Sequence, residues 1–304
     1  MSLVEKALKK LQDQRGPAPV PAAVRRTDDT ARDIAMKAPA ATPVVEPAPV
    51  PINTKTLTIN PAVLRSAGLL AAEEEQRRIA GEYRQIKRPL IAAAVGRGAT
   101  LPVPNGRVIM VASAVPGEGK TFTTVNLAFN MALEKDTSVL LIDADLPKPH
   151  VSRVMGVSEE PGLVDVLLDE TLDVESVVLP TTVRGLSFLP AGRQSSTATE
   201  LVASERMEKI VQELLRRDPK RIVLFDSSPL LLTTESRALT SVVGQVVIVV
   251  RAESTTRQAV LDAIAFVPED KTVGLVLNQS RAEPAHSYYG YGDYYGEGEL
   301  PPAR

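Results

Sequence analysis

Six stretches of this chain are rich in apolar residues and have the length of a β-strand. The runs are nearly continuous rather than alternating, as in "RVIMVASA" and "QVVIVVRA". Such strands are expected where helices cover both faces of a sheet, because neither face is left to water. The sequence between the runs predicts helices, for example over 120–135 and 198–217. We therefore predict an α/β fold with a mostly parallel central sheet flanked by helices on both faces. The six runs are residues 107–114, 137–145, 186–192, 221–228, 245–252 and 272–279.

A phosphate-binding loop is predicted between the first run and the helix that follows it. From Ala114 the sequence "AVPGEGKT" reads A-x-x-x-x-G-K-T, the P-loop pattern with alanine in its first place. The glycines allow several backbone N–H groups to face one phosphate at a helix N-terminus. Lys120 would reach the β- and γ-phosphates, and the Thr121 hydroxyl would bind Mg²⁺. The alternative is a glycine-rich turn with an unrelated lysine, but the strand–loop–helix context favours a P-loop NTPase. The residues expected to contact ATP here are Pro116, Gly117, Glu118, Gly119, Lys120, Thr121 and Phe122.

Three carboxylates follow two other predicted strands. Asp143 and Asp145 end the strand in "VLLIDADLPKP", and Asp226 ends the strand in "RIVLFD". Ligands of open parallel sheets bind outside the carboxyl ends of the strands, so all three acids should approach the phosphates. Mg²⁺ prefers oxygen ligands, and we predict Thr121, Asp143 and Asp226 for it. Lys120, Asp143 and Asp145 are the predicted catalytic residues, with either aspartate as the base.

Two segments before the α/β region differ from it in composition. Residues 1–15 predict an amphipathic helix, with apolar residues at helical spacing, and residues 16–55 are rich in proline and alanine. The second segment cannot bury enough apolar surface to fold, so we expect a disordered linker. The expected domains are therefore the helix at 1–15, the linker at 16–55, a P-loop domain at 56–280 and a tail at 281–304.

The P-loop domain is expected to begin with a helix after "INPAVL". Asn60 can cap it, and Pro61 suits the first helical turn. The helical pattern continues through "AAEEEQRRIAGEYRQIKRP" and should break near Pro89, because proline lacks a backbone N–H and crowds the preceding turn. Most of the charges in this stretch should form a solvated face.

Composition excludes several classes of protein. The formal net charge is −2, so no bulk attraction to nucleic acid is expected. The chain has no cysteine, which excludes disulfides and thiol catalysis. It contains no apolar run of the length that a transmembrane helix needs, and no signal peptide is indicated. The cytoplasm is the expected location.

The tail concentrates the tyrosines of the chain. Five of the six lie in "YYGYGDYY", and glycines are interleaved with them. The phenol has a pKa near 10 and needs help to attack, while phosphoryl transfer depends mainly on positioning and charge neutralisation. A flexible, glycine-rich stretch can bring a tyrosine into a cleft. The predicted phosphate acceptors are Tyr288, Tyr289, Tyr291, Tyr294 and Tyr295.

The motifs taken together resemble a known family. "SAVPGEGKT", "LLIDADL" and "VLFDSS", in that order and followed by a tyrosine-rich tail, resemble the Walker A, A′ and B motifs of bacterial tyrosine kinases. Related partition and cell-division ATPases usually carry a lysine directly after the first P-loop residue, where this chain has Val115. Further stretches, among them "MSLVEKALKKL", "LPAGRQSSTATELVAS" and "GLVLNQS", resemble the subgroup that acts in exopolysaccharide synthesis beside exosortase systems.

The resemblance implies a function. It implies a cytoplasmic autokinase that uses ATP and Mg²⁺ to phosphorylate its own tail tyrosines, mostly between subunits of a ring. Its partners would be the cytosolic segment of a membrane polysaccharide co-polymerase, which would hold it at the inner membrane, and a tyrosine phosphatase. Asn278 in "VLNQS" would contact the adenine; a strand-end cap is the other interpretation. The role would be control of polymer length or export, and no nucleic acid is implied.

Two departures from the family pattern affect the details. The family often has a basic residue two places after the second A′ aspartate, where this chain has Pro147 followed by Lys148. Its ring-forming E-x-x-R-x-x-R pattern is only approximated in "GEYRQIKRP". A plain solvated helix is the alternative for those charges. The predicted subunit contacts are Glu82, Arg84, Lys87 and Arg88.

Phosphorylation of the tail would change its charge greatly. Five phosphates would add roughly −7 to −10 charges, which suggests that modified tails leave a neighbour's acidic cleft and release the ring. Two other functions are open: a partition- or positioning-type ATPase without kinase activity, and a scaffold that binds ATP but does no chemistry. Val115 and the tail argue against the first, and the complete set of P-loop and carboxylate residues argues against the second.

Overall fold

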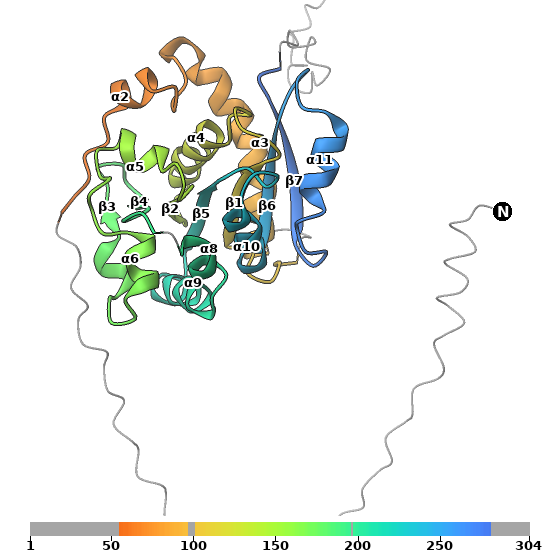
Figure 1. Cartoon of the computed structure of the whole chain (residues 1–304). Helices are drawn as coiled ribbons and strands as arrows, with labels where there is room; N and C mark the ends of the chain where they lie inside the picture. Colours follow the sequence, from red (N-terminus) through yellow and green to blue (C-terminus); the bar gives the residue numbers. More distant parts are fainter. Residues whose placement is uncertain (1–54, 97–100, 196, 281–304) are drawn as a thin grey trace, which may run out of the picture. The chain divides into compact units, whose positions relative to one another are not determined.

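The computed structural model describes residues 55–96, 101–195 and 197–280. They contain one seven-stranded sheet in the order β3-β4-β2-β5-β1-β6-β7 (Figure 1). All the neighbouring strands pair in parallel except β3, which runs antiparallel to β4. The mostly parallel sheet predicted from the sequence is thus confirmed. The strands are β1 Val108–Ser113, β2 Ser138–Ala144, β3 Leu179–Pro180, β4 Leu186–Leu189, β5 Arg221–Ser227, β6 Gln245–Arg251 and β7 Thr272–Asn278.

Helices cover both faces of the sheet and form two hydrophobic cores (Figure 1). One core joins the sheet to α2 Pro61–Ser66, α3 Gln76–Val95, α4 Lys120–Ala132 and α5 His150–Val154. The other core joins it to α6 Leu163–Leu168, α7 Val174–Val177, α8 Ala198–Val202, α9 Glu205–Arg217, α10 Thr234–Val242 and α11 Arg257–Ile264. A short 3₁₀ turn, η1 Glu73–Glu75, precedes α3. The central strands are therefore enclosed on both sides, as their continuous apolar runs predicted.

The expected break near Pro89 does not occur. Asn60 caps α2 as predicted, but the chain then turns at Ala67 and a new helix, α3, passes through Pro89 and ends at Val95. Pro89 lies on the exposed side of α3, while Ile79, Tyr83 and other residues of the opposite side are buried in the core. Packing of that buried side outweighs the lost helical hydrogen bond. Gly96, in the left-handed conformation, ends the helix.

The single helix predicted over 198–217 is two helices. Helix α8 ends at Val202 and α9 begins at Glu205. Ser204 has an extended backbone between them, and its hydroxyl donates to the carbonyl of Leu201 at 2.6 Å. Serine favours such a position because its side chain competes for nearby backbone groups.

The last strand departs from the prediction that both faces are covered. β7 pairs only with β6 and lies at one edge of the described sheet. Its Leu275 and Leu277 side chains are 59% and 64% exposed. The apolar run correctly predicted a strand, but its composition did not show that the strand was an edge.

The domain boundaries stay predictions at both ends. The segments predicted as N-terminal helix, linker and tail lie outside the described residues, apart from Lys55 at the end of the linker.

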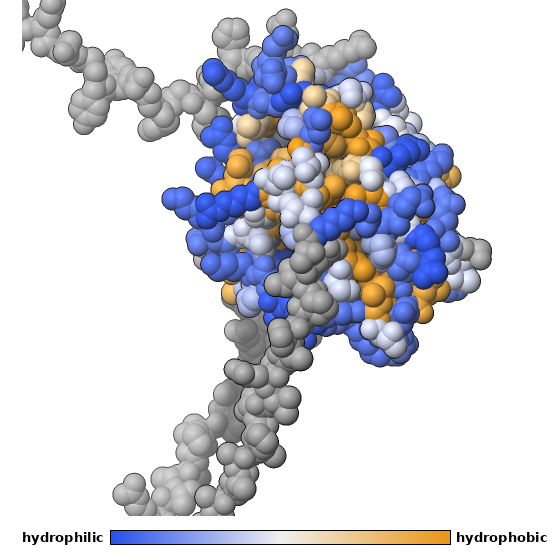
Figure 2. Space-filling model, turned by 90° about the vertical axis from the view of Figure 1, so that its left-hand side faces the viewer, coloured by the Kyte–Doolittle hydropathy of each residue, from blue (hydrophilic) through white to orange (hydrophobic). Residues whose placement is uncertain are grey.

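On the side of the domain that carries α2, hydrophobic residues gather on the surface between hydrophilic margins (Figure 2). Within the described ranges, no helix is both long and apolar enough to cross a membrane.

Candidate active site

The loop between β1 and α4 forms the predicted phosphate cradle. Gly117 and Gly119 have φ of 84° and 90°, a region that favours glycine, and α4 starts at Lys120 directly behind them. A Cβ on Gly119 would lie 2.1 Å from the Asn278 side-chain nitrogen. Both observations explain why glycine is needed, and they give the curled backbone that turns N–H groups toward a phosphate.

The Glu118 side chain fastens this loop to the rest of the domain. It is buried, and its Oε2 accepts a hydrogen bond from the Val115 backbone at 2.8 Å. Its Oε1 accepts from the Thr255 hydroxyl, and its backbone carbonyl accepts from Asn278 Nδ2 at 2.9 Å. The Glu118 side chain therefore has its own partners inside the protein, so contact with ATP is left to its backbone. The loop is held in place by β7 and by the segment that follows β6.

Lys120 is paired with the second carboxylate of "DAD". Its Nζ lies 3.0 Å from Asp145 Oδ2, and both side chains are largely shielded from solvent. The other oxygen of Asp145 accepts from the Ser228 hydroxyl at 2.7 Å. Both oxygens of Asp145 thus have partners, and an incoming phosphate would have to take Lys120 away from one of them.

Asp143 and Asp226 lie side by side on adjacent strands. They are Cα partners in the pairing of β2 with β5, and both are fully buried. Asp143 Oδ2 accepts from the backbone and hydroxyl of Ser152, and Asp226 Oδ1 accepts from Thr124 at 2.9 Å. In the described part of the chain, Asp143 Oδ1 and Asp226 Oδ2 are buried without a hydrogen-bond partner. Two unpaired carboxylate oxygens at one end of the sheet indicate an absent ligand.

Burial also changes the acidity of these two groups. It raises the pKa of Asp143 to about 7, and the charge on Asp226 adds to the rise. It raises the pKa of Asp226 to about 6, against the influence of Lys120 and of the Thr124 and Thr121 hydroxyls. A bound cation would reverse this situation, because it favours the ionised carboxylates.

The residues fit Mg²⁺ and ATP. No three acidic or histidine side chains of the described segments form a metal cage by themselves. This agrees with the chemistry of Mg²⁺, which uses one or two carboxylates together with phosphate oxygens and water. The orphaned oxygens of Asp143 and Asp226, next to the Thr121 hydroxyl and the loop, offer such a set. The ligand set remains a proposal.

A cavity adjoins the phosphate-binding loop on the side of α3. It encloses about 580 Å³ and lies between the start of α4, the end of β7 and α3. Phe122 and Asn278, both predicted to contact the nucleotide, line it together with Tyr83. Tyr83 is buried and hydrogen-bonded to Thr123, and its burial raises the pKa of the phenol far above its usual range. This cavity is a candidate for the adenine.

Comparisons with known proteins agree on one family. Residues 106–273, more than half of the chain, match the family described as "AAA domain". The tyrosine-protein kinase YwqD of Bacillus subtilis is 30% identical over 212 residues, which cover 69% of this chain and 84% of YwqD.

The chain belongs to the bacterial tyrosine kinases.

Some of the relatives that match are much longer than the chain. The succinoglycan biosynthesis transport protein ExoP of Rhizobium meliloti is 28% identical over 211 residues, or 64% of this chain but 26% of ExoP. A putative tyrosine-protein kinase of Ralstonia nicotianae is likewise matched over 25% of its length. The kinase domain of the Escherichia coli tyrosine kinase ETK has the same fold, with a TM-score of 0.58 and 25% identity over 70% of this chain and 80% of that one. The comparisons thus support protein-tyrosine kinase as the enzyme class, and they do not favour a partition-type ATPase.

The structure of this kinase-family chain brings most predicted site residues together. The loop residues, the three aspartates and Asn278 lie at the carboxyl ends of β1, β2, β5 and β7. The five predicted acceptor tyrosines lie outside the described residues.

The predicted subunit contacts are only partly accessible. Glu82, Arg84 and Arg88 are exposed on α3, where Glu82 pairs with Arg78 at 2.9 Å. Lys87 is buried, and its Nζ donates to the carbonyl of Asn130 at 2.8 Å and pairs with Glu134 at 2.7 Å. Lys87 therefore holds α3 against α4, and the prediction that it contacts a neighbouring subunit conflicts with its burial.

Sequence reasoning missed the residues that hold the carboxylates. Ser152, Ser228 and Thr124 each donate to one aspartate, and Thr255 donates to Glu118. Ser227 and Ser228 directly follow Asp226, so the sequence itself offered hydroxyl donors close to the carboxylates. The others come from separate helices and loops, and only the folded chain brings them to the site.

Proposed function

We propose that the chain is an ATP-dependent tyrosine autokinase whose acceptors are Tyr288, Tyr289, Tyr291, Tyr294 and Tyr295. The observation that carries the proposal is the pair of orphaned oxygens on Asp143 and Asp226, beside a glycine-rich loop whose Lys120 is already paired with a carboxylate. This arrangement suits a polyphosphate and a divalent cation. The described residues end at Ser280, shortly after Asn278, and the tyrosine-rich tail follows in the sequence.

The residues suggest a division of roles. Lys120 would leave Asp145 for the β- and γ-phosphates, and Ser228 would keep the Asp145 carboxylate in place. The tyrosine oxygen attacks the γ-phosphorus, the bond to the bridging oxygen of ADP breaks, and the phenolic proton passes to a carboxylate. Asp145 suits that last role once Lys120 has left it, because the unpartnered oxygens of Asp143 and Asp226 are those proposed for Mg²⁺. Bound Mg²⁺ would neutralise charge on the phosphates.

The proposed setting is a membrane polysaccharide machine. ExoP is described as a biosynthesis transport protein, and the sequence resembles the exosortase-associated subgroup. We propose that this chain takes its activation from the cytosolic segment of a polysaccharide co-polymerase at the inner membrane. It would regulate exopolysaccharide polymerisation or export, with a tyrosine phosphatase reversing the modification. Exposed Glu82, Arg84 and Arg88 would take part in a homo-oligomeric ring.

The test is tandem mass spectrometry of the tail after incubation with Mg-ATP. Wild-type protein is compared with Lys120→Met and with the control Lys135→Met, which changes an exposed lysine away from the loop. Phosphotyrosine within 288–295 is expected in the wild type and the control but not in Lys120→Met.

A missing activator has to be separated from an inactive scaffold. The same three proteins are therefore also isolated from cells that contain the partner. If the tails are unmodified in every case while Mg-ATP still binds, the autokinase proposal is wrong and the scaffold takes its place.

A further inference from the structure

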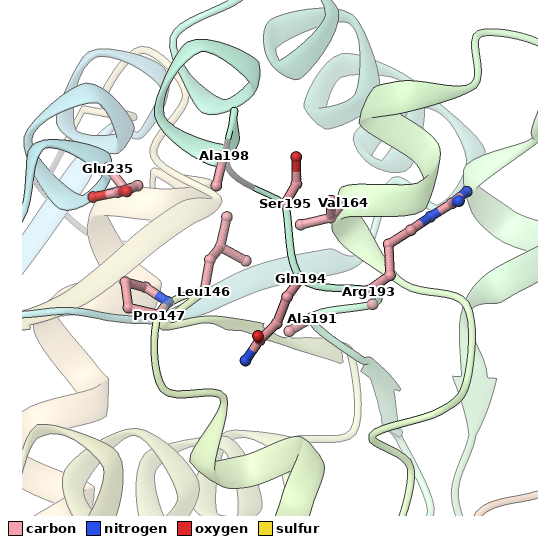
Figure 3. Close-up of a pocket in the computed structure, with 10 residues that line it drawn as sticks. Leu146, Pro147, Val164, Ala191, Arg193, Gln194, Ser195, Ala198 and Glu235 are labelled. Atoms are coloured by element: carbon pink, nitrogen blue, oxygen red, sulfur yellow. The ribbon is translucent and has the colours of Figure 1, made fainter.

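A pocket lies beside the proposed catalytic carboxylate, on the side away from the adenine cavity. It encloses about 400 Å³, and its lining begins with the two residues that directly follow Asp145. The loop after β4 and helices α6, α8 and α10 supply its other walls (Figure 3). We call it the Leu146 pocket, after a lining that includes Leu146, Pro147, Val164, Gln194 and Ala198.

The inner wall of the Leu146 pocket is apolar. Leu146, Val164 and Ala198 are buried residues of the core, and Leu146 and Ala198 point toward one another across the pocket in Figure 3. Gln194, by contrast, is exposed at the pocket's edge. A cavity with an apolar interior and a polar margin suits an amphipathic ring, such as that of tyrosine.

The start of the loop that closes the pocket is anchored to helix α6. The Arg193 guanidinium points away from the pocket and donates to Asp165 at 2.6 Å (Figure 3). The same carboxylate accepts from the backbone N–H groups of Gly162 and Arg193 at 2.9 and 3.2 Å. A Cβ on Gly192 would lie 2.3 Å from Asp165, and its φ of 82° also requires glycine. This wall of the pocket is therefore anchored, which lowers the entropic cost of binding.

The tail of this chain offers an occupant with five tyrosines, and its acidic residues suit Lys148 beside the pocket. Lys148 follows the pocket residue Pro147 and is exposed, whereas Arg193 is already paired with Asp165. The stretch 286–300 carries two glutamates and one aspartate and contains no lysine or arginine. Glu235 also lines the pocket and keeps its negative charge while it accepts a hydrogen bond from Thr199 at 2.8 Å, so the acidic residues of the tail are expected on the Lys148 side.

The spacing of the tail tyrosines suggests which ring enters. In an extended peptide, residues two apart lie on the same side, about 6.6–6.8 Å from one another. Within the tyrosine cluster, only Tyr289 and Tyr291 have this spacing. When Tyr289 lies at Asp145, Tyr291 falls near the pocket that starts at the next residue along the chain.

We propose that the Leu146 pocket binds the aromatic ring two positions after the acceptor tyrosine, so that Tyr291 assists phosphorylation of Tyr289. The inference rests on the proposed autokinase function and deepens it, because it assigns a specificity site for the acceptor. Tyrosine is used here for its ring, so phenylalanine should serve equally well at the assisting position.

The first experiment compares Tyr291→Phe with Tyr291→Ala in the full-length chain. The initial rate of phosphate incorporation at Tyr289 is followed by mass spectrometry after prior dephosphorylation. Tyr291→Phe should stay within about twofold of wild type, and Tyr291→Ala should be about tenfold slower, since burying an aromatic ring gives at least this factor. The rate at Tyr295 is the internal control and should not change. Equal Tyr289 rates in the two variants would overturn the inference.

The second experiment alters the pocket. Ala198→Leu fills it and should remove the difference between phenylalanine and alanine at position 291, whereas Ala203→Leu, at an exposed position on the end of the same helix, should preserve it. Ala198 is buried, so Gln194→Trp provides a second route that covers the edge of the pocket from an exposed position. If the difference persists in both pocket variants, the ring binds elsewhere and the assignment fails.

The two proposals fail in different ways. If no tail tyrosine is modified in any protein, the autokinase function itself is wrong. If the tail is modified but Tyr289 does not depend on the residue at 291, only the pocket assignment is wrong.

Discussion

Strands β5 and β7 have the same length and direction, and each ends close to a site residue, but they meet different surroundings. Both have seven residues, and they end in Asp226 followed by Ser227 and in Asn278. Every residue of β5 is buried, while β7 lies at the sheet edge and none of its residues is buried. Enclosure leaves Asp226 with an unpaired oxygen and a raised pKa. The side chain of Asn278 is instead positioned by a single hydrogen bond, to the backbone carbonyl of Glu118. The central strand thus places an ionisable carboxylate at the site, and the edge strand helps to position the phosphate-binding loop.

The largest effect is expected at the end of β5. Asp226→Asn keeps the shape but removes the charge, and it should slow tail phosphorylation by about 10²–10³-fold, a loss typical of a single electrostatic group. The rate is measured from phosphotyrosine formation at saturating Mg-ATP, and a circular dichroism melt serves as the folding control. A rate within tenfold of wild type would mean that the enclosed carboxylate is not needed for catalysis.

A matched pair of leucines tests the same contrast in stability. Leu224 on β5 is 0% exposed and Leu275 on β7 is 59% exposed. Leu224→Ala should lower the free energy of unfolding by about 2–5 kcal/mol, because it leaves a cavity in the core. Leu275→Ala should change it by less than about 0.5 kcal/mol. Urea denaturation followed by circular dichroism measures both. Equal losses would indicate that the edge strand is covered in solution.

The raised pKa values of Asp143 and Asp226 predict a pH dependence in the absence of Mg²⁺. Asp143 and Asp226 have folded-state pKa values of about 7 and about 6, above the ordinary value of 3.8. The folded chain therefore binds more protons than the unfolded chain between about pH 4 and 7, so the free energy of unfolding falls as pH rises through this window. Asp143→Asn should reduce that fall by on the order of 1–3 kcal/mol. Urea denaturation in EDTA at pH 5.5 and 8 gives the comparison, and a slope as steep as that of wild type would contradict the assignment.

The smallest effect is expected at the end of β7. Asn278→Ala removes the hydrogen bond to the Glu118 carbonyl, which is worth about 1 kcal/mol. The KM for ATP should rise by roughly three- to tenfold, with little change in kcat. Thr272→Ala, at the exposed start of the same strand, should leave both constants unchanged. A large fall in kcat would place Asn278 in the chemistry rather than in positioning.

The sequence predicted those features that depend on local patterns. β1, β2 and β5 were placed to within one residue, because a continuous apolar run has few other interpretations. The loop glycines and the end of "LLIDAD" also lie where they were expected. The carboxylates meet because parallel strands place their carboxyl ends at one edge, a rule that needs no coordinates.

What could not be predicted depends on contacts between distant residues. Pro89 stays inside α3 because the far side of that helix is packed, and Lys87 is buried because Asn130 and Glu134 lie opposite it. Ser228 reaches Asp145 across 83 positions of sequence. No local spacing contains such information. The exposure of β7 could not be predicted either, because its composition is that of a central strand.

The burial of Tyr83 has a practical consequence. It is the one tyrosine of the chain outside 288–295, and it is enclosed between α3 and α4 with its hydroxyl engaged by Thr123. The folded domain therefore offers a kinase no accessible phenol, from this copy or any other. A generic phosphotyrosine antibody applied to the native protein therefore reports on the tail alone. Its signal measures phosphorylation of the five tail tyrosines without the need to map the modified sites.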